Sequence, residues 1–323
     1  MCKFHFISFY QISFNRMKRN VSEISANLIS KLWDAYLRRV PFARFYVDLV
    51  NRRGGRIIHD HLGFRTFYTH TGEQPEGIPA ISHIFNFLEY KPAQKYSFPK
   101  KHLKAVCFEP ENAGLPKIFI SQLDVQELPL WGRYKLTDIL KDTPYLISVT
   151  GIELLGKLKA DGNLTTEAAD ILEDELVKYF RRPWKPPLKD TVIQLNDVSH
   201  YAAWVLLHGN RPSHFAVLIN RQNVSSWPDL ETTCDALKKF GLPMKDKIEG
   251  ERGSRLQQSA TFAIKEDVVV RGIEGLEKIT WTYAYLELIR RGNIQENDQT
   301  VFSPGFIEDQ ECQMYDMTVT LDN

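Results

Sequence analysis

A histidine and an arginine stand four positions apart in the segment Asp60-His61-Leu62-Gly63-Phe64-Arg65-Thr66-Phe67. Side chains two residues apart share one face of a β-strand, so His61, Gly63 and Arg65 are expected to face one space. An imidazole can bind a metal ion, and a guanidinium can hold a carboxylate through two parallel hydrogen bonds. Gly63 would leave room for a ligand to approach the backbone. A hydrogen-bonded histidine beside a solvated arginine is the alternative for this segment alone.

A second histidine, His214, lies where a loop containing Gly209 and Pro212 enters an apolar strand. Rigid strand ends that carry loops are common places for functional side chains. His200 and His208 compete with it, although their spacing of eight residues also fits an exposed helix face. Taken alone, this segment leaves the choice among the three histidines open.

A carboxylate, Glu287, is embedded in the apolar and aromatic run 279–289. The alternating pattern predicts that it shares a strand face with Trp281, Tyr283 and Tyr285. A buried, unpaired carboxylate is costly, so a cation or strong hydrogen-bond donors should accompany it. A salt bridge to Arg290 or Arg291 is the alternative to a metal ion.

Together, His61, His214 and Glu287 form a set of two histidines and one carboxylate. Such a set leaves coordination positions open for substrate and oxygen on non-haem iron. The spacing of the three residues along the chain does not by itself show that they meet in space.

The elements that must position these residues are short strands interleaved with helices. Periodicity and punctuation by proline and glycine predict helices at 21–40 (capped by Asn20), from Pro41 to about Val50, and at 165–180, 197–209 and 228–241. They predict strands at 56–68, 104–109, 117–123, 145–150, 214–220, 259–270 and 278–290. The fold class is therefore predicted to be α+β, with a β-rich core and helices outside it. We expect one catalytic domain over 21–323, built from two intertwined halves at about 21–182 and 190–323.

The composition is that of an ordinary globular protein. Its 323 residues include 41 basic and 40 acidic ones, so net charge provides no attraction to nucleic acid or to an anionic membrane. The four cysteines are scattered without a CxxC pair, which indicates a reduced, intracellular setting. Residues 1–20 are expected to be an extension that is disordered or not translated. They contain no span for a bilayer, so we expect a cytoplasmic protein, with import into an organelle as the alternative.

The order of motifs resembles the 2-oxoadipate dioxygenase/decarboxylase family, whose core is similar to the vicinal-oxygen-chelate fold. The resemblance covers about residues 24–320. It is carried by DHLGFRTF at 60–67, LPKIFISQLDVQELP at 115–129, HYAAWVLLHGNRPSHF at 200–215, RLQQSATFA at 255–263 and TYAYLEL at 282–288.

The resemblance implies an Fe(II) site made by His61, His214 and Glu287, with Arg65 holding a substrate carboxylate. It implies conversion of 2-oxoadipate and O2 into 2-hydroxyglutarate and CO2, by analogy within lysine breakdown. Candidates to hydrogen-bond the metal ligands are Gln257, Gln258, Ser259 and Tyr285. The alternatives are another 2-oxo acid as substrate, a divalent-metal isomerase, lyase or hydrolase on the same fold, and a non-catalytic binding protein. The oligomeric state does not follow from the sequence.

Overall fold

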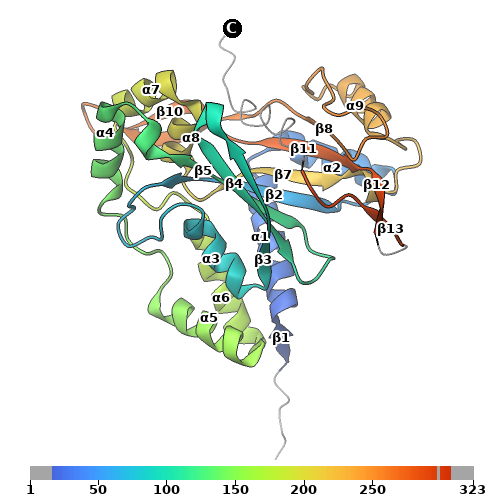
Figure 1. Cartoon of the computed structure of the whole chain (residues 1–323), viewed down its shortest axis with the longest axis horizontal. Coiled ribbons are helices and arrows are strands. Elements are labelled where there is room, and N and C mark those ends of the chain that lie inside the picture. The colour runs from blue at the N-terminus through green and yellow to red at the C-terminus, as the bar shows by residue number, and fades with distance from the viewer. Residues whose placement is uncertain (1–16, 297–298, 307–323) are drawn as a thin grey trace, which may run out of the picture.

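A curved seven-stranded sheet forms the centre of the protein, in the strand order β3-β4-β5-β2-β7-β11-β8 (Figure 1). The structure is a computed structural model that describes residues 17–296 and 299–306. The strands of this sheet are β2 (His59–Tyr68), β3 (Tyr90–Phe98), β4 (Leu103–Pro110), β5 (Lys117–Asp124), β7 (Pro212–Leu218), β8 (Leu256–Ala260) and β11 (Tyr285–Arg291). Strand β2 lies in the middle and pairs with β5 in parallel and with β7 antiparallel.

Helices surround the sheet, and short strands form two-stranded sheets beside it (Figure 1). The helices are α1 (Val21–Leu37), α2 (Pro41–Arg52), α3 (Pro79–Phe87), α4 (Leu130–Leu140), α5 (Val149–Asp161), α6 (Thr166–Tyr179), α7 (Lys189–Val198), α8 (His200–His208) and α9 (Leu230–Lys239). The remaining strands are β1 (Lys18–Asn20), β6 (Asn163–Thr165), β9 (Lys265–Arg271), β10 (Leu276–Thr282), β12 (Asn293–Glu296) and β13 (Gln299–Phe302). No helix in the described ranges is long and apolar enough to cross a lipid bilayer.

Helix α1 begins where the sequence predicts, after Asn20. The Asn20 side chain accepts a hydrogen bond from the backbone of Glu23, whose carboxylate in turn accepts one from the backbone of Asn20. This reciprocal capping satisfies two backbone donors that a helix start leaves without partners. The buried side chains of α1, which include Ile24, Leu28 and Leu32, recur about every four residues and pack on the core.

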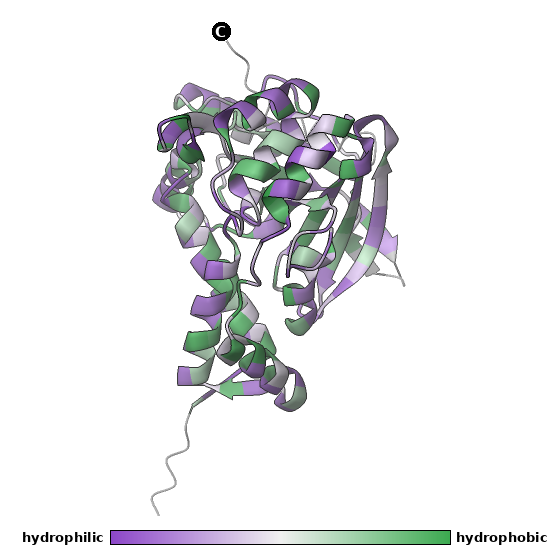
Figure 2. Cartoon of the chain, turned by 90° about the vertical axis from the view of Figure 1, so that its left-hand side faces the viewer, coloured by the Kyte–Doolittle hydropathy of each residue, from purple (hydrophilic) through white to green (hydrophobic). Residues whose placement is uncertain are grey.

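Helices α1, α5 and α6 extend below the sheet with the small β1–β6 sheet, and we call this group the stem (Figures 1 and 2). In Figure 2 its helices carry both hydrophobic and hydrophilic residues, as amphipathic helices do. Residues 18–20, which the sequence analysis assigns to the N-terminal extension, pair here with residues 163–165. The rest of that extension, residues 1–16, lies outside the described residues.

Three strand predictions differ from the structure. The prediction of a strand at 145–150 is wrong, because Ser148 caps α5, which starts at Val149. The predicted strand 259–270 is the end of β8 followed by β9, and the predicted strand 278–290 is most of β10 followed by β11. In both cases the chain leaves one sheet and enters another within a few residues. A local pattern of alternating residues does not reveal such a change of sheet.

The α+β fold class is confirmed. Strands β2 to β5 of the sheet come from the first half of the chain, and β7, β8 and β11 come from the second. The antiparallel pairing of β2 with β7 joins the two groups of strands. Side chains that are far apart in sequence therefore lie beside each other on the same sheet face.

Candidate metal centre

The register of three neighbouring strands explains why the predicted ligands meet. His61 on β2 pairs with Ala216 on β7, and Ala216 pairs with Glu287 on β11. Paired residues of neighbouring strands share a face, so His61 and Glu287 flank the small side chain of Ala216. In the next row along the strands, Gly63 pairs with His214, which pairs with Tyr285. His214 therefore projects from the middle strand toward the space between His61 and Glu287.

The ligand atoms of these three residues lie close together. The Nε2 atoms of His61 and His214 are 3.1 Å apart, and Glu287 Oε2 lies 3.3 Å from the first and 3.4 Å from the second. One ligand atom from each residue lies within 4.8 Å of the other two. The three residues thus form a possible metal-binding set at the centre of the sheet.

The surroundings of Glu287 fit a cation. Its side chain is fully buried, and neither carboxylate oxygen accepts a well-oriented hydrogen bond from any described residue. Leaving a buried carboxylate without donors costs several kcal/mol (about 1–3 or more), and a positive ion removes that cost. His61 is fully buried and His214 nearly so. The three metal-ligand atoms therefore face one another in a space shielded from solvent.

The two imidazoles have opposite pKa shifts. Burial lowers the pKa of His61, but its contacts with Asp60 and Glu287 outweigh burial and raise this pKa to about 9. Burial, together with the charges of His61 and Arg65, lowers the pKa of His214 well below its usual range. In the metal-free protein one imidazolium and one neutral imidazole therefore face the carboxylate near neutral pH. A bound cation would take the place of that proton.

Arg65 lies on the same strand, two residues beyond Gly63, and is buried. Its guanidinium carbon is 5.0 Å from the ring centre of Trp204 and 5.4 Å from that of Tyr201, and its side chain hydrogen-bonds Tyr285. Arg65 also lines a cavity of about 10 Å³ together with His214 and Tyr285. The predicted arginine and the second predicted histidine thus border the same small space.

Only some of the predicted supporting residues face the centre. The Tyr285 hydroxyl lies 3.1 Å from His214 Nδ1. The pairing of β8 with β11 places Gln258 on the face of Glu287 and turns Gln257 and Ser259 to the opposite face. There Gln257 donates to Glu231 on α9 at 2.9 Å.

The structure does not support the alternative histidine ligands or the alternative arginine partners of Glu287. His200 is exposed and bonds Asn196, and His208 is buried with its Nε2 against the carbonyl of Thr282. Neither belongs to the metal-binding set. Of the two predicted alternative partners of Glu287, Arg291 forms a bidentate ion pair with Asp60, and Arg290 donates to Gln257 at 3.5 Å.

Two other expectations from the sequence also change. Tyr283 and Trp281 do not share a strand face with Glu287, because the chain changes sheets at residues 283–284. Gly63 leaves room for the ring of His214 rather than for an outside ligand, since an added Cβ would lie 2.0 Å from His214 Cε1. Sequence reasoning also missed Asp60, although its place next to His61 is a signal that could have found it.

The buried His208 yields a prediction on pH and stability. Burial, with added repulsion from Arg39 and Arg211, lowers the pKa of His208 well below its usual range. Below about pH 6.5 His208 is protonated in the unfolded chain but stays neutral in the folded protein. The free energy of unfolding therefore falls as pH falls. Urea unfolding at pH 7.5 and pH 5.5 should show the wild type losing about 1.4 kcal/mol more than His208→Gln. Equal losses in the two proteins would contradict this role of His208.

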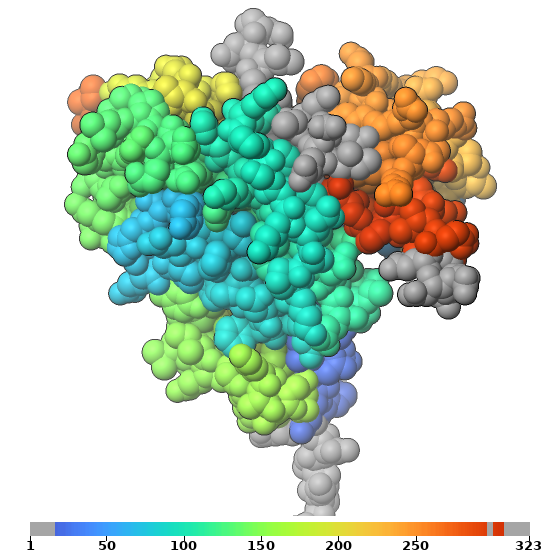
Figure 3. Space-filling view, viewed as in Figure 1, coloured from blue at the N-terminus to red at the C-terminus, as the bar shows by residue number. Residues whose placement is uncertain are grey.

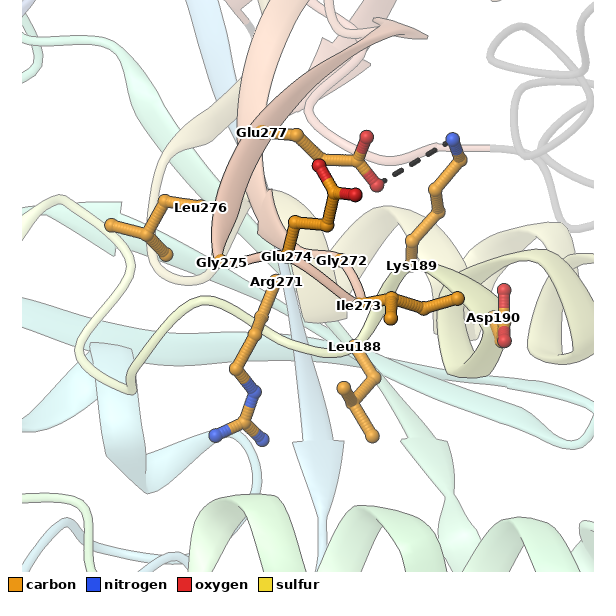
Figure 4. Close-up of a pocket in the computed structure, with 10 residues that line it drawn as sticks. All are labelled: Leu188, Lys189, Asp190, Arg271, Gly272, Ile273, Glu274, Gly275, Leu276 and Glu277. Carbon is orange, nitrogen blue, oxygen red and sulfur yellow. Dashed lines mark ion pairs between the residues drawn. The ribbon is translucent and has the colours of Figure 1, made fainter.

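A surface hollow of about 670 Å³ lies elsewhere, at the turn between β9 and β10 and the start of α7 (Figure 4). An ion pair of 3.5 Å between Lys189 and Glu277 crosses its rim, and the exposed side chains of Ile273 and Leu276 point away from one another. None of the three candidate ligands lines this hollow. The metal-binding set and this surface hollow are therefore at different places.

Comparison with known proteins agrees with this geometry. The family model described as 2-oxoadipate dioxygenase/decarboxylase matches residues 29–302. The chain belongs to this family. A family member from Oryza sativa, named chloroplastic/amyloplastic 2-oxoadipate dioxygenase/decarboxylase, is 28% identical over an alignment of 257 residues that covers 73% of this chain and 61% of the relative. The chain thus spans about three fifths of that relative's length.

Solved structures show the same fold in this family and around it. A glyoxalase superfamily protein from Ralstonia eutropha superposes with a TM-score of 0.81 at 24% identity, covering 90% of this chain and 87% of the other. A hydroxyglutarate synthase from Oryza sativa, in complex with 2-oxoadipate, superposes with a TM-score of 0.71 at 23% identity, covering 92% and 93%. The predicted vicinal-oxygen-chelate type of core, the fold of the glyoxalase superfamily, is confirmed.

Proposed function

We propose that this protein is an iron(II) enzyme that converts 2-oxoadipate and O2 into 2-hydroxyglutarate and CO2. The observation that carries the proposal is the meeting of His61, His214 and Glu287 in one buried space, with Arg65 on the same strand as His61. The names of the family and of the rice proteins support the choice of substrate. The reaction balances, because both atoms of O2 remain in the two products.

The donor set favours iron(II) among divalent metals. Two imidazoles and one carboxylate leave several coordination positions open, as in non-haem iron oxygenases. Iron(II) held by these residues would supply the reaction with O2 that no amino-acid side chain can supply. The buried ring nitrogens and the unsatisfied carboxylate of Glu287 are the features of this chain that fit the ion.

Side chains around His214 hold its ring in place. The hydroxyls of Tyr285 and Ser213 lie 3.1 Å and 3.2 Å from His214 Nδ1. The Ser213 hydroxyl donates to the carbonyl of Gly63 at 3.2 Å, so its oxygen can accept the Nδ1 hydrogen of His214, and that tautomer leaves the lone pair of Nε2 facing His61 and Glu287. The protein thereby presents one lone pair to the metal-binding space before any ion is bound.

Arg65 would bind the carboxylate at the far end of the substrate. Its packing against Tyr201 and Trp204 fixes a side chain that otherwise has several rotatable bonds. A fixed guanidinium holds a carboxylate through two parallel bonds and so orients the 2-oxo group at the other end. The aromatic surroundings also exclude water, which strengthens the ion pair.

The direct test is anaerobic purification, loading with Fe(II), and simultaneous measurement of O2 uptake and CO2 release with a panel of 2-oxo acids. We expect uptake and release in a ratio of about one to one with 2-oxoadipate, following the balance of the reaction. Turnover without O2 would instead indicate a metal-dependent isomerase, lyase or hydrolase. Absence of turnover with every 2-oxo acid would indicate a binding protein.

Arg65→Lys should reduce kcat/KM for 2-oxoadipate by about 100-fold, because lysine cannot make the bidentate contact. The same substitution should change kcat/KM for 2-oxohexanoate, which lacks the distal carboxylate, by less than about threefold. Steady-state O2 uptake with both substrates measures the two effects. An equal loss of kcat/KM on both substrates would show that Arg65 does not bind the distal carboxylate.

The cellular location stays a prediction. The plastid location in the rice relative's name supports the organelle alternative over the cytoplasmic expectation. The link to lysine breakdown is likewise a proposal that follows from the substrate.

A further inference from the structure

A buried acid contacts one of the candidate ligands from behind. Asp60 Oδ2 lies 2.9 Å from Nδ1 of His61, the ring nitrogen that faces away from His214 and Glu287. The pairing of β2 with β7 shifts register between His59 and His61, so that Asp60 is an extra residue in a β-bulge. A bulge redirects side chains, which explains how two consecutive residues can contact each other here.

Arg291 holds this acid from the end of β11, the strand that carries Glu287. Its Nε and Nη2 donate to the two carboxylate oxygens of Asp60 at 2.5 Å and 2.8 Å. Its Nη1 donates to the carbonyls of Ser303 and Gly305 at 2.9 Å and 2.8 Å. One guanidinium thus connects the acid behind His61 to the segment Ser303–Phe306, which we call the cover segment.

The cover segment lies against the candidate metal centre. The ring of Phe306 meets that of His61 edge to face, with centroids 4.8 Å apart. The guanidinium carbon of Arg291 lies 5.0 Å from the centroid of the same Phe306 ring. The backbone of Phe306 donates to the Tyr96 hydroxyl at 3.2 Å. In Figure 3 the red surface of the β12–β13 region, which precedes this segment, lies beside the surface of β4 and β5, and Lys117 of β5 donates to the carbonyl of Pro304.

We propose that Asp60 and Arg291 are positioning residues that orient Nε2 of His61 toward the metal. Through Arg291, this orientation also depends on the position of the cover segment. Asp60 accepts the Nδ1 hydrogen of His61 and so selects the tautomer with a free lone pair on Nε2. Arg291 binds Asp60 through Nε and Nη2 and the carbonyls of the cover segment through Nη1, so one rigid guanidinium couples the position of Asp60 to that segment. This inference rests on the proposed metal centre, and it adds the residues that orient one ligand.

A purely structural role explains the arrangement less well. A buried ion pair adds little to stability relative to apolar residues of the same size, because both charges lose their hydration. Here nearly all hydrogens of the Arg291 guanidinium go either to the acid behind His61 or to the segment over it. Groups that hydrogen-bond a metal-binding histidine typically contribute about 10- to 100-fold to metal affinity.

The test uses Co(II) alone as the probe, with the wild type, Asp60→Asn, Arg291→Lys and a control, Glu173→Gln. Glu173 is also a buried carboxylate with cationic partners, Arg19 and Lys31, but it lies in the stem on α6. Competition with a chelating dye gives the Kd, and the visible spectrum of bound Co(II) reports the ligand geometry. Hydrogen exchange of the Ser303 and Phe306 amides, with and without Co(II), reports the cover segment.

We expect Asp60→Asn to weaken Co(II) binding by about 10- to 100-fold with an altered spectrum, and Glu173→Gln to bind as the wild type does. Arg291→Lys keeps the charge and should fold even if Asp60→Asn does not. It should weaken Co(II) binding at least about threefold and abolish the slowing of amide exchange that Co(II) causes in the wild type. Wild-type affinity, spectrum and exchange in Arg291→Lys would overturn the inference.

The outcomes separate this inference from the proposed function. A wild type that binds no Co(II) overturns the metal centre and the positioning role together. A wild type that binds Co(II) but does not act on 2-oxoadipate overturns the proposed reaction. In that case the affinity, spectrum and exchange of the variants still decide the role of Asp60 and Arg291.

Discussion

Glu287→Gln is expected to abolish O2 uptake and to weaken Fe(II) binding by more than about 100-fold. Loss of a residue that hydrogen-bonds a metal ligand typically lowers metal affinity by about 10- to 100-fold. Loss of the one anionic ligand of the set should lower it more. The carboxylate supplies the only negative charge within this donor set, and the neutral amide that replaces it keeps the shape but not the charge. Titration of the metal-free protein with Fe(II) under anaerobic conditions measures the loss.

Thermal unfolding distinguishes this loss from a folding defect. At a free metal concentration of about 100 Kd, binding should stabilise the wild type by about 2.7 kcal/mol and raise its Tm. At the same Fe(II) concentration Glu287→Gln should gain no more than about 0.4 kcal/mol, so its Tm should rise far less, whereas Glu173→Gln should respond as the wild type does. A metal-dependent rise in the Tm of Glu287→Gln equal to that of the wild type would remove Glu287 from the site.

Gly63→Ala is expected to inactivate the protein although it adds one methyl group. An added Cβ would lie 2.0 Å from Cε1 and 2.4 Å from Nε2 of His214, and real Cβ atoms do not approach other atoms so closely. The ring of His214 must therefore move. A displacement of about 1 Å of a catalytic group costs on the order of 100-fold in rate, and forced overpacking costs about 1–3 kcal/mol of stability.

A matched glycine separates the local clash from the general effect of losing a glycine. Gly156 lies exposed in helix α5 of the stem, and apart from the adjoining residues and backbone of its own helix no atom lies within 4 Å of a Cβ added there. Gly156→Ala should keep full activity and metal affinity, and it should be more stable by about 0.5–1 kcal/mol because alanine favours helix. Kinetics, Fe(II) titration and urea unfolding of both variants test this pair. Normal Fe(II) binding by Gly63→Ala would mean that His214 does not need its observed position.

The residue types of the site could be predicted from the sequence because their chemistry is local. A histidine and an arginine with a glycine between them on a strand, and a carboxylate in an apolar run, are visible without a structure. The resemblance selected His214 among three histidines. The proximity of these residues could not be predicted, because it depends on the register of β2 with β7 and of β7 with β11. Register is set by the packing of whole strands, and a shift of one residue turns every side chain to the other face.

The neighbours of the site were harder to predict for the same reason. Gln257, Gln258 and Ser259 are consecutive, and only the pairing of β8 shows that the middle residue alone faces Glu287. Arg291 looked like a partner for Glu287 because it is near in sequence, but it reaches across to Asp60. Long-range ion pairs of this kind depend on a bulge and on the chain's course after β11. Neither feature leaves a periodic pattern in the sequence.

The row of His61, Ala216 and Glu287 across β2, β7 and β11 has a consequence for the lifetime of the protein. One ligand comes from the first part of the chain and two come from the second, so a bound ion acts as a removable cross-link between them. Cells short of the metal would hold a population that lacks this stabilisation and unfolds more readily. Proteases, which cleave opened chains, would clear that population first, so metal supply would set the abundance of this protein as well as its activity.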